Sequence, residues 1–297
     1  MTDALLSFVQ ISDIHLRPPA DRSGWWLSLE PSRLLAAAVA QVAGLAGLDF
    51  VLFSGDLLDR AEPAALDQFR ALVAALPCPH YVCVGNHDVA IPARPGRFDK
   101  ASFAAALALP PRLDYSLPVK PGFRLYVLDS VSDEDHHSPG TLHADQLDWL
   151  EAELDGHRDE LGIVALHHPP LPGFAPYDFR FRPADGRHFS RILEKSPQIA
   201  CVLNGHLHVP RRWSFHRRPF FSAPSLGGPP NAMRQFTIRR DGERLRLDYR
   251  WLTVLPEGRR PLWYPLTAGG RSDREGSILL PHAAESRRLS TVWQGLL

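Results

Sequence analysis

The stretch Phe50-Val51-Leu52-Phe53-Ser54-Gly55-Asp56 decides the fold of this chain. Its four consecutive apolar residues, aromatic or branched, predict a strand that is buried on both faces. A serine, a glycine and a carboxylate follow at once, which is typical of a strand that ends at a ligand-binding edge of its sheet. The same pattern recurs where apolar runs lead into Ser12-Asp13-Ile14-His15, Gly85-Asn86-His87-Asp88, His167-His168-Pro169-Pro170 and Asn204-Gly205-His206-Leu207-His208.

The segments between these strands carry apolar residues at helical spacing. We expect helices that begin at Ser32, whose hydroxyl is a favourable N-cap, over residues 63–76, and from Thr141 onward. Strands that alternate with helices predict an α/β fold with crossover connections. In the C-terminal third, apolar residues alternate on both sides of Asp241-Gly242, which predicts an antiparallel hairpin.

The composition excludes several classes of protein. The 297 residues include 33 basic and 33 acidic side chains, and this balance argues against a nucleic-acid or anionic-membrane binder that works through bulk attraction. The chain contains no apolar stretch of the roughly 20 residues that a membrane helix needs, and its first residues lack the features of a secretory signal. Three cysteines are too few for a disulfide framework, so we expect a reducing cytoplasm.

The five strand ends supply metal ligands. Ligands bind at the carboxyl ends of strands in open α/β sheets, so the polar residues that follow these strands are expected to converge. They are Asp13, His15, Asp56, Asn86, His87, His206, His208 and either His167 or His168. Imidazole, carboxylate and amide ligands without a thiolate suit Mn, Fe, Zn, Co or Ni.

These five motifs, in this order, resemble the calcineurin-like metallophosphoesterases. The GNHD, HHPP and GHLH segments are most similar to the branch of class III cyclic-nucleotide and glycerophosphodiester phosphodiesterases. The resemblance implies an α/β fold with four layers, an α/β/β/α sandwich of two mixed β-sheets flanked by helices. Residues 1–255 would form this domain, and residues 256–297 a C-terminal extension that is loosely structured or packed on it.

The resemblance also implies a role for each motif residue. It assigns Asp13, His15 and His208 to a first metal, Asn86, His167 and His206 to a second, and Asp56 to both. His87 would be the catalytic residue that faces the substrate phosphate. Residue physics alone does not choose between His167 and His168. The similarity favours His167 as the ligand and leaves His168 as a substrate contact or as a residue that orients the ligands.

The implied cofactors are two divalent or mixed-valence transition metal ions, Mn, Fe, Zn or Co. Two dications about 3.7 Å apart repel by roughly 18 kcal/mol at an effective dielectric of 20, so the site needs bridging anions. Asp56 would be one, and a metal-bridging hydroxide that attacks phosphorus would be the other. Counting two metals, Asp13, Asp56 and hydroxide leaves about one positive charge, which complements a small-molecule phosphodiester.

The same sequence motifs are compatible with other functions. The same site could serve a phosphomonoesterase, a nucleotide pyrophosphatase or a nuclease, although a nuclease would need a basic groove. A non-catalytic metal-binding interaction scaffold is the alternative from another class, and such scaffolds are expected to lose ligands that this chain retains. The irregular segment 171–187 is expected to act as a lid or as the contact of a homodimer.

Overall fold

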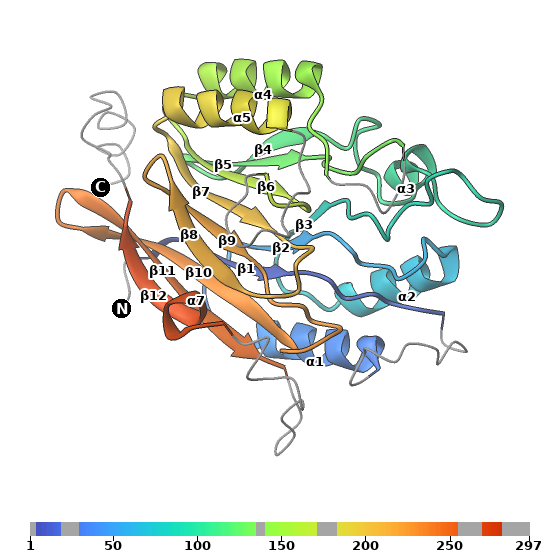
Figure 1. Cartoon of the computed structure of the whole chain (residues 1–297). Coiled ribbons are helices and arrows are strands. Elements are labelled where there is room, and N and C mark those ends of the chain that lie inside the picture. The colour runs from blue at the N-terminus through green and yellow to red at the C-terminus, as the bar shows by residue number, and fades with distance from the viewer. Residues whose placement is uncertain (1–3, 19–29, 135–139, 171–182, 255–268, 281–297) are drawn as a thin grey trace.

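Two six-stranded sheets form the centre of the molecule (Figure 1). The computed structural model describes residues 4–18, 30–134, 140–170, 183–254 and 269–280. The strands of the first sheet, in spatial order, are β12 (Glu275–Leu279), β11 (Arg244–Thr253), β10 (Ala232–Asp241), β1 (Ala4–Ile11), β2 (Phe50–Ser54) and β3 (His80–Cys83). Those of the second are β4 (Tyr115–Lys120), β5 (Phe123–Leu128), β6 (Leu161–Leu166), β7 (Ile199–Asn204), β9 (Arg218–Ser222) and β8 (Arg211–Phe215).

Both sheets are mixed. In the first, β1, β2 and β3 run parallel while β10, β11 and β12 are antiparallel additions. In the second, β5, β6, β7 and β9 run parallel, with β4 and β8 antiparallel at the two edges. Parallel strands end on the same side of their sheet, so this topology brings the polar residues after β1, β2 and β3 together, and likewise those after β6 and β7.

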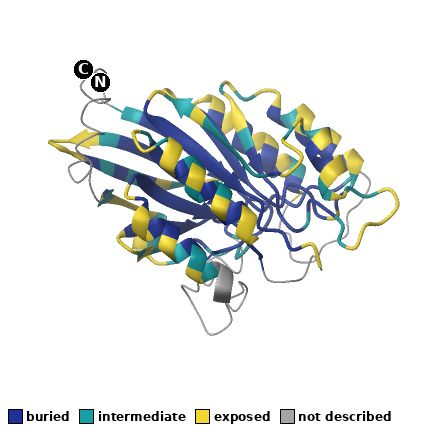
Figure 2. Cartoon of the chain, turned by 90° about the horizontal axis from the view of Figure 1, so that it is seen from above, coloured by how far each residue is buried: buried dark blue, intermediate teal, exposed yellow. Residues whose placement is uncertain are grey.

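Helices cover the outer face of each sheet, and Figure 1 shows the resulting four layers. The first sheet packs against α1 (Pro31–Ala43), α2 (Pro63–Val73) and α3 (Lys100–Ala106), and the second against α4 (Ala144–Gly156) and α5 (Pro183–Lys195). Seen from above in Figure 2, the central strands are buried almost throughout, the edge strands β4, β8 and β12 are more exposed, and the helices expose their outer faces. The predicted α/β/β/α sandwich is therefore confirmed.

Apolar residues on alternate sides of each strand fill the three interfaces. Along β1, Val9 and Ile11 face the helices, while Leu6 and Phe8 face the second sheet. The Phe8 ring stacks on the rings of the neighbouring strands, 4.7 Å from Phe50 and 4.9 Å from Phe236 between centroids. A strand that is buried on both faces needs apolar residues at successive positions. This is the pattern from which these strands were predicted.

Some boundaries differ from the sequence expectations. Ser32 does not cap α1, because Pro31 occupies the first turn, Glu30 is the N-cap, and the Ser32 hydroxyl donates to the Glu30 carboxylate. The helix that was predicted from Thr141 onward is α4, and it begins at Ala144. The predicted hairpin around Asp241-Gly242 is present as β10–β11, and β8 and β9 form a second antiparallel hairpin.

Part of the predicted C-terminal extension joins the first sheet. The short helix α7 (Arg271–Arg274) leads into β12, which pairs with β11. The division at residues 255 and 256 stays a prediction. Most of the segment 171–187 lies outside the described residues, and its role as a lid or dimer contact stays a prediction. Among the described residues, no helix combines the length and apolarity that crossing a membrane requires.

Candidate metal centre

The strand ends of the two sheets meet at one buried site. Asp13 and His15 follow β1, Asp56 follows β2, and Asn86 follows β3. From the second sheet, His167 and His168 follow β6, and His206 and His208 follow β7. The structure thus brings all the predicted site residues together, from segments up to 195 positions apart in the chain (residues 13 to 208).

The first group of donors contains Asp13, His15, Asp56 and His208, which can each place a ligand atom within 4.8 Å of the others. The Nε2 atom of His208 lies 3.2 Å from Asp13 Oδ1 and 3.1 Å from His15 Nε2. His15 Nε2 lies 3.7 Å from Asp56 Oδ2. Ligands about 2 Å from one metal ion are separated by about 3 to 4 Å, so these spacings suit a shared cation.

The second group lies on the other side of Asp56. His167 Nε2 is 3.2 Å from Asp56 Oδ2, and His206 Nδ1 is 3.2 Å from Asn86 Oδ1. His168 also belongs to a possible ligand group with His167 and His206. However, the Nδ1 atom of His168 is 3.0 Å from the Ser130 hydroxyl, and its ring lies tilted beside the His206 ring, 4.4 Å away. The geometry therefore leaves both a ligand role and a substrate contact open for His168.

An unsatisfied oxygen supports the fit of a cation. The Oδ2 atom of Asp13 is buried and has no hydrogen-bond partner among the residues that the structure describes. A buried carboxylate oxygen without a partner is costly, and a metal ion would satisfy it. The donor set of imidazole nitrogens and carboxylate and amide oxygens, without thiolate, matches the predicted Mn, Fe, Zn or Co.

The backbone at this site is strained. Asp13, His15, Asp56, His206 and His208 all have a positive φ, between 53° and 70°. This left-handed region is uncommon for residues with a side chain, and costs of order 1–3 kcal/mol per residue are typical where structures retain it at functional sites. Each of these five strained residues belongs to one of the two groups of possible ligands.

Two glycines allow the close approach of the strand ends. A Cβ atom at Gly85 would collide with the backbone nitrogen and the carboxylate of Asp56. A Cβ atom at Gly55, where φ is +94°, would collide with the His167 ring. These positions require glycine because a neighbouring strand end occupies the space of the side chain.

The charges of the buried groups depend on one another. Burial alone would raise the pKa of Asp56, but His167 and His87 lower it well below its usual value. Conversely, burial opposes protonation of His167, but the Asp56 carboxylate raises the pKa of His167 to about 9. Burial and the charge of His167 together lower the pKa of His206 to about 3. The buried carboxylates thus attract positive charge, which metal ions would supply.

His87 lies beside the donors and at the edge of a cavity. Its backbone nitrogen donates to Asp56 Oδ1 over 2.9 Å, and its ring Nδ1 lies 2.8 Å from the backbone oxygen of Asp59. The ring meets the His15 ring edge-on, with centroids 4.8 Å apart. Because Nδ1 lies within hydrogen-bond distance of a backbone carbonyl, it carries the proton in the neutral ring, and Nε2 is then the unprotonated nitrogen.

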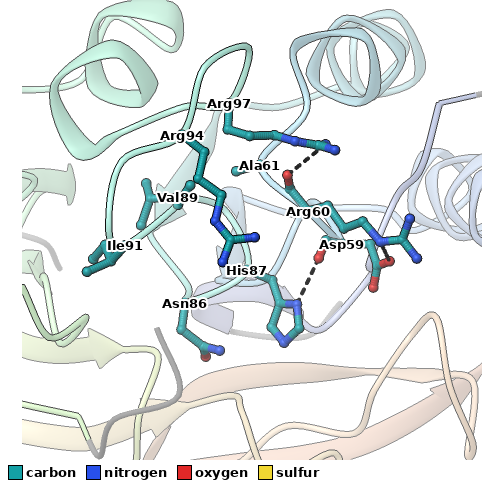
Figure 3. Close-up of a pocket in the computed structure, with 10 residues that line it drawn as sticks. Asp59, Arg60, Ala61, Asn86, His87, Val89, Ile91, Arg94 and Arg97 are labelled. Atoms are coloured by element: carbon teal, nitrogen blue, oxygen red, sulfur yellow. Dashed lines mark hydrogen bonds and ion pairs between the residues drawn. The ribbon is translucent and has the colours of Figure 1, made fainter. Parts of the chain in front are cut away.

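The cavity next to His87 has a volume of about 300 Å³ (Figure 3). Asn86 and His87 form the side toward the metal centre. Three arginines of the lining, Arg60, Arg94 and Arg97, were not among the predicted site residues. They lie in loops without hydrophobic periodicity, so their sequence positions carried no signal beyond their nearness to two strand ends.

Two further carboxylates stabilise the loops around the possible ligands through hydrogen bonds. Asp88 accepts hydrogen bonds from the backbone nitrogens of Leu58 and Gly85, which ties the loops after β2 and β3 together. Burial and the charge of Asp56 raise the pKa of Asp88 to about 7. Asp59 accepts a 3.0 Å hydrogen bond from Arg17. Both carboxylates thus position the loops that carry the predicted ligands.

Two mixed sheets between helices, with histidine and aspartate donors from both sheets at one edge, define a metallohydrolase of the α/β/β/α class. The family model of the calcineurin-like phosphoesterases matches residues 6–210, and the chain belongs to this family. Members of the family are hydrolases that use two divalent transition metals, so the predicted family, enzyme class and metal dependence are confirmed.

The relatives include several phosphodiesterases. The chain is 33% identical to a cAMP/cGMP dual specificity phosphodiesterase of Mycobacterium tuberculosis, over 56% of this chain but only 51% of that protein. It is 28% identical to the 3′,5′-cyclic adenosine monophosphate phosphodiesterase CpdA of Pseudomonas aeruginosa, over 87% of this chain and 89% of that protein. The glycerophosphodiester phosphodiesterase GpdQ of Enterobacter lignolyticus is 28% identical, over 67% and 69% respectively.

Solved structures share the fold at low identity. A dimetal phosphatase from Danio rerio superposes with a TM-score of 0.71 at 16% identity, over 94% of this chain and all of that one. GAP50, described as the anchor in the inner membrane complex of Plasmodium, superposes with a TM-score of 0.57 at 10% identity, over 98% and 93%. The fold alone therefore does not determine the activity, which must be argued from the site.

Proposed function

We propose that this protein hydrolyses phosphodiesters of the cyclic-nucleotide or glycerophosphodiester type at a dinuclear centre. In this proposal, Asp56 would help to hold both metal ions. The ligands of the first metal are Asp13, His15 and His208, and those of the second are Asn86, His167 and His206. The observation that carries the assignment is the position of Asp56 Oδ2, 3.2 Å from His167 Nε2 in one group and 3.7 Å from His15 Nε2 in the other.

Bound metals would supply Lewis acidity, which polarises the phosphoryl oxygens and lowers the pKa of a nearby water to about 7. The two aspartates offset only part of the charge of two dications, so the site retains a positive charge that suits a phosphodiester monoanion. The strained backbone fixes the ligand atoms before substrate arrives, so little reorganisation is needed during the reaction.

His87 acts on the substrate in this proposal. Its Nε2 atom carries a proton when the imidazole is charged, and the Asp56 carboxylate raises the pKa of His87 against the effect of burial. A charged His87 can neutralise a phosphoryl oxygen or donate its Nε2 proton to the leaving oxygen. The 2.8 Å contact of Nδ1 with the Asp59 backbone oxygen keeps the ring in place for either role. His168 is the second candidate for a substrate contact.

A substrate panel on protein reconstituted with Mn²⁺ tests the activity. The diesters are cAMP, cGMP, glycerophosphocholine and bis(p-nitrophenyl) phosphate, and the monoester is p-nitrophenyl phosphate. We expect kcat/KM for at least one natural diester to exceed that for the monoester by more than tenfold. A preference for the monoester, or no turnover of any diester, would contradict the proposal. The exposed Asp67 provides a control, since Asp67→Asn should leave the panel unchanged.

Three further expectations accompany this activity. The names of the relatives support a small phosphodiester as substrate, and the neutral net charge argues against nucleic acid as a partner. A homodimer and a cytoplasmic location stay predictions. Size-exclusion chromatography with light scattering measures the first, and localisation of a tagged chain by fluorescence microscopy measures the second.

A further inference from the structure

The cavity beside the metal centre contains an arginine with an uncompensated charge. The Arg94 side chain makes no hydrogen bond or ion pair with any residue that the structure describes. Figure 3 shows its guanidinium directed toward the side of the cavity formed by Asn86 and His87. The other two arginines of the lining differ, because Arg60 lies 3.4 Å from Asp59 and Arg97 pairs with Glu62.

The loop that carries Arg94 is anchored at both ends. Ala90 donates to the Phe98 backbone oxygen over 2.7 Å, which closes the loop. Phe98 donates to the Ala61 oxygen, and Ala61 donates to the His87 oxygen, each over 2.9 Å. This chain of backbone hydrogen bonds connects the loop to the segment that follows β3. The exposed residues 92–96, which include Arg94, therefore form a loop whose two ends are attached beside the cavity.

Positive charge exceeds negative charge around the cavity. The Asp59 carboxylate interacts with two arginines, because the Arg17 guanidinium also lies 3.0 Å from it. The described lining of the cavity contains three guanidinium groups and one carboxylate, that of Asp59, and Arg97 pairs with Glu62 outside the lining. The positive charge that Arg94 adds to the lining complements a phosphate monoester, which carries about −1.5 to −2 at neutral pH. A guanidinium also matches phosphate oxygens in bidentate geometry.

The cavity and the metal centre share two residues. Asn86 lines the cavity while its Oδ1 lies 3.2 Å from His206 Nδ1, and His87 lines the cavity while its ring touches His15. A substrate whose scissile phosphate lies at the metals can therefore extend directly into the cavity. Its volume of about 300 Å³ is enough for a small substituent but not for a long chain.

From these observations we infer that the cavity is a second phosphate subsite, in which Arg94 selects phosphodiesters that carry an additional phosphate monoester. This inference rests on the proposed phosphodiesterase function and narrows its substrate class. Arg94 binds the additional phosphate, which takes no part in bond cleavage. A charge-assisted hydrogen bond of this kind raises affinity by about ten- to a hundredfold.

A matched pair of esters tests the subsite by activity. Thymidine 5′-(p-nitrophenyl phosphate) and its 3′-phosphorylated form release the same p-nitrophenol and differ only in the second phosphate. We expect kcat/KM to be at least tenfold higher for the 3′-phosphorylated ester, and Arg94→Gln to bring this ratio close to one. Arg33→Gln removes a comparable charge from a side chain that is 85% exposed on α1, and should keep the ratio of the parent protein. A ratio near one in the parent protein, or an unchanged ratio in Arg94→Gln, overturns the inference.

A binding experiment separates this inference from the proposed function. Isothermal titration calorimetry compares thymidine 3′,5′-bisphosphate with thymidine 5′-phosphate on the same Mn²⁺-loaded protein. We expect the bisphosphate to bind at least tenfold more tightly, and Arg94→Gln, but not Arg33→Gln, to abolish the difference. Equal affinities overturn the subsite whether or not either ester is hydrolysed. Failure to hydrolyse both esters, with the binding difference intact, contradicts the proposed function alone.

Discussion

Asp56 shows how a single residue combines several demands. Its carboxylate is 2% exposed, lies between two groups of histidines, and accepts a hydrogen bond from the His87 backbone. Its positive φ of 53° is a conformation that a sequence pattern does not reveal. Its position after a buried strand predicted it as a metal ligand, and the family resemblance implied its shared role. Neither revealed the strained geometry, which depends on the neighbouring strand ends.

Removal of the His87 imidazole should affect catalysis more than metal binding. We expect His87→Ala to lower kcat by about 10²–10⁴ for substrates with an alkoxide leaving group, because a positioned acid contributes that much. The loss should be smaller for p-nitrophenyl esters, whose leaving group needs little protonation. Steady-state kinetics on both substrate types, with metal content measured by elemental analysis, distinguish an acid from a group that only neutralises charge.

The control for His87 is another histidine. His157 lies at the C-terminal end of α4, near Glu153 and Glu160, and His157→Ala should retain kcat within about twofold. Equal losses on both leaving groups would assign His87 to charge neutralisation. Loss of a metal from His87→Ala would instead show that His87 is a ligand, and the proposed ligand set would be wrong.

Asp114 should make stability depend on pH. Its carboxylate is mostly buried, accepts hydrogen bonds from the Asp129 backbone and from Gln146, and burial raises its pKa to about 6. The unfolded chain has the lower value of 3.8, so the folded state binds this proton more tightly. Asp114 therefore destabilises the fold increasingly as pH rises from about 4 to above 6, by on the order of 2 kcal/mol.

Asp114→Asn keeps the hydrogen-bond acceptor and removes the titration. We expect the variant to have a higher free energy of unfolding than the parent protein, as measured by urea denaturation between pH 4 and 8. This difference should grow as the pH rises to about 7. Asp67→Asn, at a side chain that is 75% exposed, should show no such trend. A difference between Asp114→Asn and the parent protein that does not change with pH would contradict the assigned pKa.

At the scale of elements, the buried strands were predictable and the loops were not. Continuous apolar runs such as Ile163-Val164-Ala165-Leu166 have few alternatives to a strand with both faces covered, and β6 is 0–5% exposed at its apolar positions. By contrast, β12 has the sequence Glu-Gly-Ser-Ile-Leu, in which no alternation is visible. Its pairing with β11 is a tertiary effect, as is the loop that carries Arg94.

The close contact between the ends of β2 and β3 predicts the effect of Gly85→Ala. The added Cβ would collide with the backbone and carboxylate of Asp56, and overpacking of this kind costs about 1–3 kcal/mol. Because Asp56 must move, we also expect Mn²⁺ affinity to fall at least tenfold. Gly156→Ala is the control, since no atom lies within 4 Å of its Cβ position.

The two measurements for this pair are the thermal midpoint and the Mn²⁺ dissociation constant. Gly156→Ala should leave the metal affinity unchanged and the midpoint equal or slightly higher. If Gly85→Ala retains both the midpoint and the metal affinity, the space between the two strand ends is larger than the structure shows.

At the scale of the whole molecule, the metal centre joins the two sheets. Asp13, Asp56 and Asn86 extend from the first sheet, whereas His167 and His206 extend from the second. The interface between the sheets is built around rings such as Phe8 and Phe221, and buried hydrogen bonds from Gln10 to the Asn204 backbone oxygen and from Arg234 to the Ser222 backbone oxygen also cross it. The order of motifs along the sequence indicated that the strand ends converge. It did not indicate that the ligands divide between two sheets, because that depends on strand order in space.

This division predicts that metal binding stabilises the fold as a whole. The ligand atoms are brought together only when both sheets are packed, so Mn²⁺ should bind the folded state and scarcely the unfolded one. At a free concentration one hundred times the dissociation constant, such binding adds about 2.7 kcal/mol of stability and should raise the thermal midpoint by about 5 °C or more. Asp56→Asn should lose most of this increase, because it removes the carboxylate that faces both groups of donors, while Asp67→Asn should keep it. Differential scanning calorimetry with Mn²⁺ or with a chelator measures both. A midpoint that does not respond to the metal in the parent protein would show that the two sheets are not joined through the site, and the proposed ligand set would have to be abandoned.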